Sequence, residues 1–142
     1  EWKMVMHDIY HVKQVPLPEL LRTFFVFGVI GYGRIGSRAA AKARGLGMRV
    51  LACDPFISAE KIAEGGAQKV SQEQLLSESD YVSVHTPLMT NTRHLINAAT
   101  LAQMKPSAYL INTARGGMID EAALVAAHEC AGVQPARRRG VG

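Results

Sequence analysis

The chain has 142 residues, of which 48% are hydrophobic and 20% charged, and its formal net charge is +4. This composition is typical of one globular domain. The longest apolar run, Phe24 to Tyr32, is far too short to cross a bilayer, so we expect a cytoplasmic protein with no membrane partner. Its basic residues form no stripe with interleaved aromatics, and Cys53 and Cys130 lack paired Cys/His spacing, so neither a nucleic-acid partner nor a metal is expected.

Short apolar runs alternate with helical stretches along the middle of the chain. Strands are predicted at 24–30, 49–53, 68–70, 81–84 and 108–112, and helices at 35–46, 58–64, from Ser71, at 98–104 and at 120–127. Gly45 and Gly47 are suitable stops for the first helix, and Ser71 with Gln74 predicts a capping box. The strands show little polar alternation, which indicates burial on both faces. The expected fold is α/β, a Rossmann-type doubly wound parallel sheet.

The two ends of the chain lack this alternation. Residues 1–22 contain two prolines and no clean period, which predicts a linker or a helix that belongs to another part. Residues 128–142 mix Gly, Pro and Arg, which predicts a disordered tail. We therefore expect one dinucleotide-binding domain at 23–127.

A glycine-rich motif joins the first strand to its helix. Residues 31–36 spell G-Y-G-R-I-G, in which Gly31 allows a tight turn, Gly33 lets the backbone approach a pyrophosphate, and Gly36 lets helix and strand pack closely. The N–H groups around Arg34 and Ile35 are expected to point at the anion. A merely tight strand–helix turn is the alternative, but the predicted flanking strand and helix favour nucleotide binding.

An acidic residue ends the second predicted strand. Asp54 follows Gly36 by 18 residues, close to the interval of about 20 expected for the residue that binds the adenosine ribose. A carboxylate can accept hydrogen bonds from both ribose hydroxyls and would repel a 2′-phosphate. Because Pro55 and Phe56 follow, and not an arginine, NAD is favoured over NADP. The alternative is that Asp54 and Pro55 only mark a turn.

Two further loops follow strands at the edge where such a sheet binds ligands. These loops carry D-Y-V-S-V-H-T-P-L from Asp80 and N-T-A-R-G-G from Asn112, with M-K-P from Met104 between them. Together with G-Y-G-R-I-G and Asp54–Pro55, these motifs make the chain resemble the D-isomer-specific 2-hydroxyacid dehydrogenases, a group that includes phosphoglycerate dehydrogenase and the C-terminal-binding-protein corepressors. The resemblance covers about 26–127.

The resemblance implies roles for residues of both loops. Arg115 would be catalytic: its guanidinium would face the nicotinamide and pair with the substrate's carboxylate and 2-oxo group. The remaining loop residues would line the cofactor groove, namely His85, Thr86, Pro87, Thr113 and Ala114. From the residues alone, a surface arginine and a packing histidine remain alternatives.

The family's acid–base histidine and its acidic partner should follow a later strand than those predicted. His128 and Glu129 are neighbours on a helix and do not face each other, so we reject them as that pair. The chain is therefore expected to be a fragment of an oxidoreductase that acts on 2-hydroxy or 2-oxo acids, inactive alone. Its sheet should be incomplete on the C-terminal side, and the parent family is expected to form homodimers. A non-catalytic, NAD-responsive corepressor-like scaffold is one alternative; another NAD enzyme, such as an adenosylhomocysteinase-like one, is disfavoured by Arg115.

Overall fold

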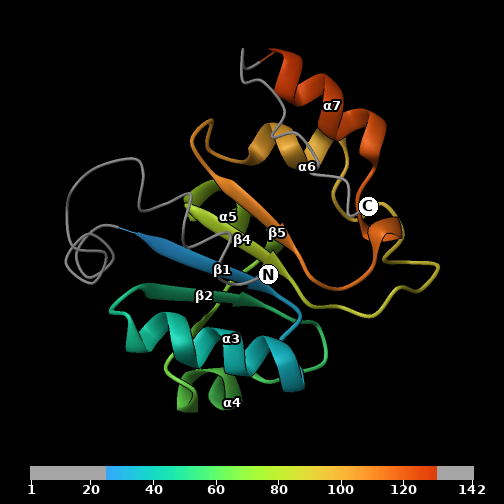
Figure 1. The fold of residues 1–142 in the computed structure, drawn as a ribbon. Coiled ribbons are helices and arrows are strands. Elements are labelled where there is room, and N and C mark those ends of the chain that lie inside the picture. Colours follow the sequence, from blue (N-terminus) through green and yellow to red (C-terminus); the bar gives the residue numbers. More distant parts are fainter. Residues whose placement is uncertain (1–24, 131–142) are drawn as a thin grey trace, which may run out of the picture.

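The computed structural model describes residues 25–130 (Figure 1). The segments predicted as an N-terminal linker (1–22) and most of the predicted tail lie outside this range. The strands are β1 (Val26–Ile30), β2 (Arg49–Cys53), β3 (Gln68–Lys69), β4 (Tyr81–Val84) and β5 (Tyr109–Asn112). The helices are α3 (Arg34–Gly45), α4 (Ala59–Glu64), α5 (Gln72–Glu78), α6 (Ala98–Gln103), the 3₁₀ helix η1 (Gly116–Met118) and α7 (Glu121–Cys130).

The strands form one five-stranded parallel sheet in the order β3-β2-β1-β4-β5. The chain first winds outward from β1 to β3, then crosses back to β4 beside β1, so the strand order reverses between these two strands. This arrangement matches the first five strands of the classic Rossmann order 3-2-1-4-5-6, in which ligands bind beyond the carboxyl ends of the strands near the reversal point. The expected α/β fold is confirmed, and β5 is an edge strand of the described sheet.

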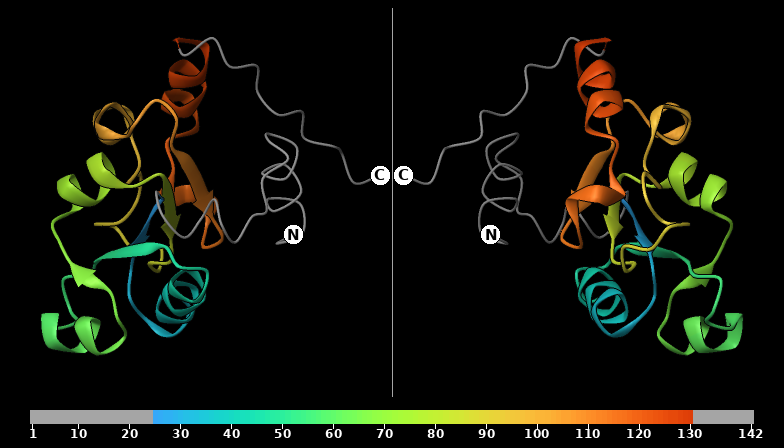
Figure 2. Two further views of the ribbon diagram at one scale, coloured as in Figure 1. Left: turned by 90° about the vertical axis from the view of Figure 1, so that its left-hand side faces the viewer. Right: turned by 90° about the vertical axis from the view of Figure 1, so that its right-hand side faces the viewer.

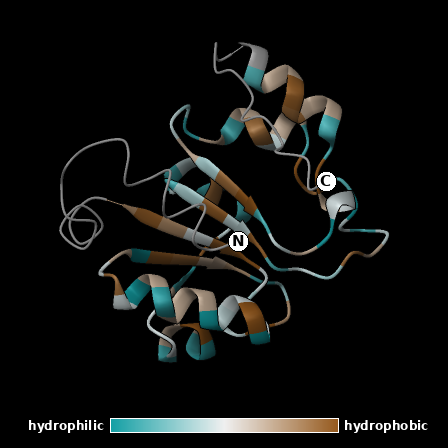
Figure 3. Cartoon of the chain, viewed as in Figure 1, coloured by the Kyte–Doolittle hydropathy of each residue, from teal (hydrophilic) through white to brown (hydrophobic). Residues whose placement is uncertain are grey.

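Helices cover both faces of the sheet. In Figure 1, α3 and α4 lie below the sheet and α6 and α7 above it, and the turned views of Figure 2 show the same separation. Alternate residues of β1 serve the two layers: Phe27 and Val29 belong to the core cluster with α3 and α4, and Ile30 belongs to the cluster with α5. Figure 3 shows hydrophobic residues along the strands, as expected for strands buried on both faces.

The ends of several helices follow from their capping residues. Helix α3 ends in a Schellman motif, because Gly47 has a φ of +87° and the N–H of Met48 donates to the carbonyl of Ala43 at 3.1 Å. The predicted capping box at α5 forms only in part: Ser71 Oγ accepts from Gln74 N, but the Gln74 side chain donates to Glu78 instead. A complete capping box begins α6, between Asn97 and Thr100.

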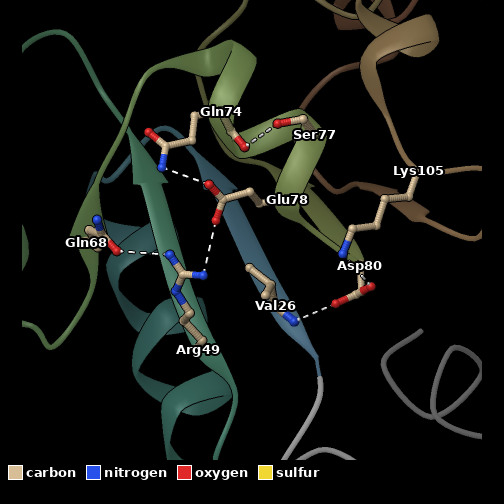
Figure 4. A network of polar contacts seen from close by, with 8 residues as sticks. All are labelled: Val26, Arg49, Gln68, Gln74, Ser77, Glu78, Asp80 and Lys105. Carbon is tan, nitrogen blue, oxygen red and sulfur yellow. Dashed lines mark hydrogen bonds and ion pairs between the residues drawn. The ribbon is translucent and has the colours of Figure 1, made fainter.

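Polar contacts fix the amino ends of the strands, away from the edge with the glycine turn (Figure 4). The Asp80 carboxylate accepts from the backbone N–H of Val26 at 2.7 Å and pairs with Lys105 Nζ at 3.1 Å. This side chain therefore ties the starts of β1 and β4 to the segment that enters β5. A more exposed pair, Arg49 with Glu78, lies nearby at 3.1 Å.

Helix α7 runs to Cys130, beyond the helix end predicted at Ala127. His128, where we predicted the disordered tail to begin, is an exposed residue of this helix. None of the helices in residues 25–130 is long and apolar enough to cross a membrane.

Candidate functional site

The turn between β1 and α3 is built so that only glycines fit at two of its positions. Gly31 has a φ of +91°, and a Cβ there would lie 2.8 Å from the backbone nitrogen of Thr86, on the loop after β4. A Cβ on Gly36 would collide with the carbonyl oxygen of Gly31. These glycines let the turn pack tightly against α3 and against the end of β4.

Gly33 differs from the other two glycines, because a Cβ there would meet nothing within 4 Å. It is the N-cap residue of α3, and no side chain caps the helix. The N–H groups of the first turn, starting at Arg34 and Ile35, therefore have no intrahelical acceptor and carry the positive end of the helix dipole. Open space beside a glycine and unpaired N–H groups make a place suited to an anion.

The carboxylate of Asp54 lies beside this turn. Its Oδ2 accepts a hydrogen bond from the backbone N–H of Tyr32 at 2.8 Å, and its Oδ1 accepts from Phe56 N at 2.8 Å. Tyr32 is the second residue of the G-Y-G-R-I-G motif, so the acid at the end of β2 is bound directly to the glycine turn. Asp54 is half-buried, and each carboxylate oxygen retains acceptor capacity for a further donor. Pro55, next to it, is exposed.

The loop after β4 is bound to β1 and to the loop after β5. The backbone N–H of His85 donates to the carbonyl of Ile30 at 2.8 Å. The His85 ring contacts Ser83 Oγ through Nε2 at 2.8 Å and Thr113 Oγ1 through Nδ1 at 3.4 Å. Burial lowers the pKa of the His85 imidazole below its ordinary value of 6.5. A second contact joins Thr86 Oγ1 to Met118 Sδ at 4.0 Å.

The loop after β5 presents Arg115 at the surface. The Asn112 side chain shapes this loop: its Nδ2 donates to the carbonyl of Arg115 at 2.9 Å, and its Oδ1 accepts from Ala114 N at 3.1 Å. Arg115 is the N-cap residue of η1, and its carbonyl also accepts from Met118 N at 3.1 Å. Its backbone is therefore held in place, while its guanidinium forms no hydrogen bond or ion pair with another residue of the described range.

The structure brings most of the predicted residues to one edge of the sheet. The register pairs the last residue of β1, Ile30, with Cys53 and with Val84, and pairs Val84 with Asn112, so all four strands end together. The glycine turn, Asp54 and His85 are joined by direct contacts, whereas Arg115 stands on a loop two strands away from β1. Sequence reasoning placed Ser83 and Asn112 within motifs but assigned neither a role; the structure shows that they orient neighbouring loop residues.

With this geometry in view, comparison with known proteins identifies the family. Residues 16–136 match the model of the D-isomer specific 2-hydroxyacid dehydrogenase, NAD binding domain. The chain belongs to this family. The match extends beyond 26–127, the range covered by the motifs, at both ends, and it begins within the segment that we expected to lie outside the domain.

Similar proteins carry dehydrogenase names. The chain is 51% identical over 104 residues to D-3-phosphoglycerate dehydrogenase of Synechocystis, covering 73% of this chain and 19% of that protein. The apo-structure of D-lactate dehydrogenase from Escherichia coli has a TM-score of 0.73 and 40% identity, covering 78% of this chain and 35% of that one. The NAD complexed form of the Lactobacillus delbrueckii enzyme has a TM-score of 0.71 and 38% identity, over 77% and 32%.

These relatives support the oxidoreductase interpretation over the corepressor-like scaffold. The chain spans about a fifth of the curated relative and about a third of the solved structures.

Proposed function

We propose that this domain binds NAD(H) across the carboxyl edge of β1, β2 and β4. The N–H groups at Arg34 and Ile35 would hold the pyrophosphate, with Gly33 leaving room for it and Gly31 and Gly36 shaping the turn. The observation that carries the proposal is the 2.8 Å hydrogen bond from Tyr32 N to Asp54 Oδ2, because it holds the proposed ribose-binding carboxylate against the glycine turn.

The same carboxylate supports NAD over NADP. Asp54 would accept hydrogen bonds from both ribose hydroxyls, while its negative charge would oppose a 2′-phosphate. Its neighbours Pro55 and Phe56 are exposed and uncharged, so neither offers the phosphate a cation. The other proposed cofactor neighbours come from the two later loops: His85, Thr86, Pro87, Thr113 and Ala114.

For the whole protein we propose hydride transfer between NAD(H) and a 2-hydroxy or 2-oxo acid. The bound cofactor supplies or accepts the hydride. Arg115 would pair with the substrate carboxylate through its planar guanidinium and stabilise negative charge on the carbonyl oxygen. Its exposed position after β5 and its fixed backbone suit this task. The 142-residue chain alone should bind NADH without turnover, because among residues 25–130 we assign no general acid–base pair. A cytoplasmic location and a homodimeric parent remain predictions.

The test is a pair of fluorescence titrations, with NADH and with NADPH, on the 142-residue chain and on Asp54→Ala. Losing the hydrogen bonds to a charged acceptor should weaken NADH binding by about 1.5–3 kcal/mol, or roughly 10- to 150-fold. NADPH should bind no more weakly than before, because its phosphate no longer meets a carboxylate. Glu64→Ala, which removes an exposed carboxylate at the end of α4, is the control and should leave both affinities unchanged.

Asp54→Ala also removes the acceptor of the Tyr32 N–H, so both titrations must be run well below the unfolding midpoint of the variant. The ratio of the two dissociation constants does not depend on the folded fraction, since both ligands meet the same sample. If that ratio is the same in Asp54→Ala as in the unmodified chain, the ribose assignment is wrong.

A further inference from the structure

A small polar cluster links the end of β4 to the loop that carries Arg115. Its members are the hydroxyl of Ser83, the imidazole of His85 and the hydroxyl of Thr113. Ser83 is fully buried, His85 half-buried and Thr113 exposed, so the cluster runs from the interior of the sheet to the surface. His85 is the only member that contacts both of the others.

The burial of Ser83 determines the direction of the hydrogen bonds. Its hydroxyl has no partner other than His85 among the described residues, and a buried O–H group is nearly always paired. We therefore assign the Ser83 proton to a bond with Nε2. The imidazole proton then resides on Nδ1 and is donated to Thr113 Oγ1, which is 3.4 Å away. Only the neutral imidazole offers the buried Ser83 proton an acceptor.

Thr113 adjoins the segment that fixes Arg115. Asn112 holds the carbonyl of Arg115 within the loop, but these bonds are internal to the loop and do not fix it relative to β4. Among the described residues, the contact from His85 to Thr113 is one of two side-chain hydrogen bonds that join the two loops; the other is the weak one from Thr86 to Met118. Backbone bonds from His94 to Gly117 and from Ile96 to Met118 hold η1 two and three residues beyond Arg115, whereas His85 contacts the loop before Arg115.

We propose that His85, in addition to its proposed place beside the cofactor, is a positioning residue that holds the Arg115 loop against the end of β4 through Thr113. This inference deepens the role proposed for Arg115 and rests on it. Protonation puts a second N–H on Nε2, opposite the O–H of the buried Ser83, so the Ser83 proton loses its acceptor. The ring should then shift away from Ser83, and its bond from Nδ1–H to Thr113 should weaken, so the loop should be held when the imidazole is neutral and loosened when it is protonated. The groups in contact with the ring are those two hydroxyls, and burial alone, with no charged group among the described residues, lowers its pKa.

Arg115 itself reports on the loop, since trypsin cleaves after arginine and needs a mobile segment. We would measure cleavage after Arg115 by mass spectrometry on the full 142-residue chain, divided by cleavage after Lys61 in α4. Losing one neutral hydrogen bond should raise this ratio by about two- to twelve-fold in His85→Ala and in Thr113→Val. Thr113→Ser, which keeps the hydroxyl, should restore the original ratio. Since Thr113 is exposed, its variants should fold even if His85→Ala does not.

The pH profile separates positioning from general support. In the unmodified chain the ratio should rise as pH falls from 8 towards 5.5, and in His85→Ala it should stay flat at the raised value. Each of four results would overturn the proposal. For the Thr113 variants, these are an unchanged ratio in Thr113→Val and no rescue by Thr113→Ser. The others are equal increases in cleavage after Arg115 and after Lys61, and a pH slope of the ratio that survives in His85→Ala.

The same samples distinguish this failure from failure of the proposed function. Cleavage is measured without cofactor, so it does not depend on where NADH binds. If Asp54→Ala leaves NADH binding unchanged while the cleavage ratios behave as expected, only the cofactor site is wrong. If His85→Ala weakens NADH binding as strongly as Asp54→Ala while the ratio is unchanged, His85 binds the cofactor and the positioning role is wrong.

Discussion

The second and third glycines of the motif, Gly33 and Gly36, should respond to alanine in opposite ways. At Gly33 an added Cβ meets nothing within 4 Å, so Gly33→Ala should fold normally. Its cost should be about 1 kcal/mol or less, because alanine is a poorer N-cap than glycine. At Gly36 the added Cβ meets the carbonyl oxygen of Gly31 and lies 3.1 Å from Val29 Cγ1, in buried surroundings that cannot move freely. Such overpacking costs about 1–3 kcal/mol.

For NADH affinity we expect the opposite order, with Gly33→Ala the more damaging change. The space beside Gly33 is where we place the pyrophosphate, so the extra methyl should displace it from at least one N–H group of α3. Losing one hydrogen bond to a charged group corresponds to about 1.5–3 kcal/mol, or roughly 10- to 150-fold in the dissociation constant for NADH. Gly33→Ala should therefore lose binding with little loss of stability, whereas Gly36→Ala should lose stability first.

Thermal unfolding and NADH titration on the same preparations test this pair. For a domain of this size each kcal/mol corresponds to roughly 4–8 °C in the midpoint, so the instability of Gly36→Ala should be plain. A Gly33→Ala chain that unfolds at the normal temperature and binds NADH as tightly as the unmodified chain would refute the placement of the pyrophosphate.

Three further predictions concern stability and association. Asp80→Ala should lower the free energy of unfolding by about 1–3 kcal/mol, because it leaves Val26 N–H and Lys105 without their acceptor. Glu78→Ala should lower it by less than about 1 kcal/mol, since the pair of Glu78 with Arg49 is exposed. Urea denaturation compares the two variants, and equal losses would contradict the assignment. Because burial lowers the pKa of His85 in the folded state, the folded state binds fewer protons at His85 than the unfolded state does near neutral pH. The contribution of His85 to stability should therefore be full above about pH 6.5 and should be lost as the pH falls from there through the lower folded pKa. A His85→Gln chain whose stability has the same pH slope would rule this out. β5 is an edge strand of the described sheet, and Tyr109 on it is 49% exposed. The chain should therefore self-associate in sedimentation experiments, and Tyr109→Lys should reduce the self-association. A monomeric chain with a high unfolding midpoint would count against this prediction.

The sequence was sufficient to predict those parts of the fold whose signals are local. The apolar runs at 49–53 and 81–84 have clear boundaries, and both strands form with those bounds. The glycine stops likewise predicted the end of α3, and the Ser71 cap the start of α5, to within a residue or two. Helix α7 continues to Cys130 because no glycine or proline interrupts it before Gly132.

The contacts that build the site are not local, and this is why the sequence could not give them. That Asp54 would lie near the glycine turn follows from the motif, but its bond to Tyr32 N–H depends on the register of β1 with β2. The contact of His85 with Thr113 depends on the pairing of β4 with β5. Ser83 lies within the motif from Asp80, but its role depends on its burial beside His85, which the motif does not reveal.

A crystal structure of the chain with NADH would be the most direct measurement. We expect diphosphate oxygens at about 2.9 Å from the first amide nitrogens of α3, and both hydroxyls of the adenosine sugar on the Asp54 carboxylate. A cofactor whose diphosphate lies away from Gly33, or whose sugar makes no contact with Asp54, would contradict the account.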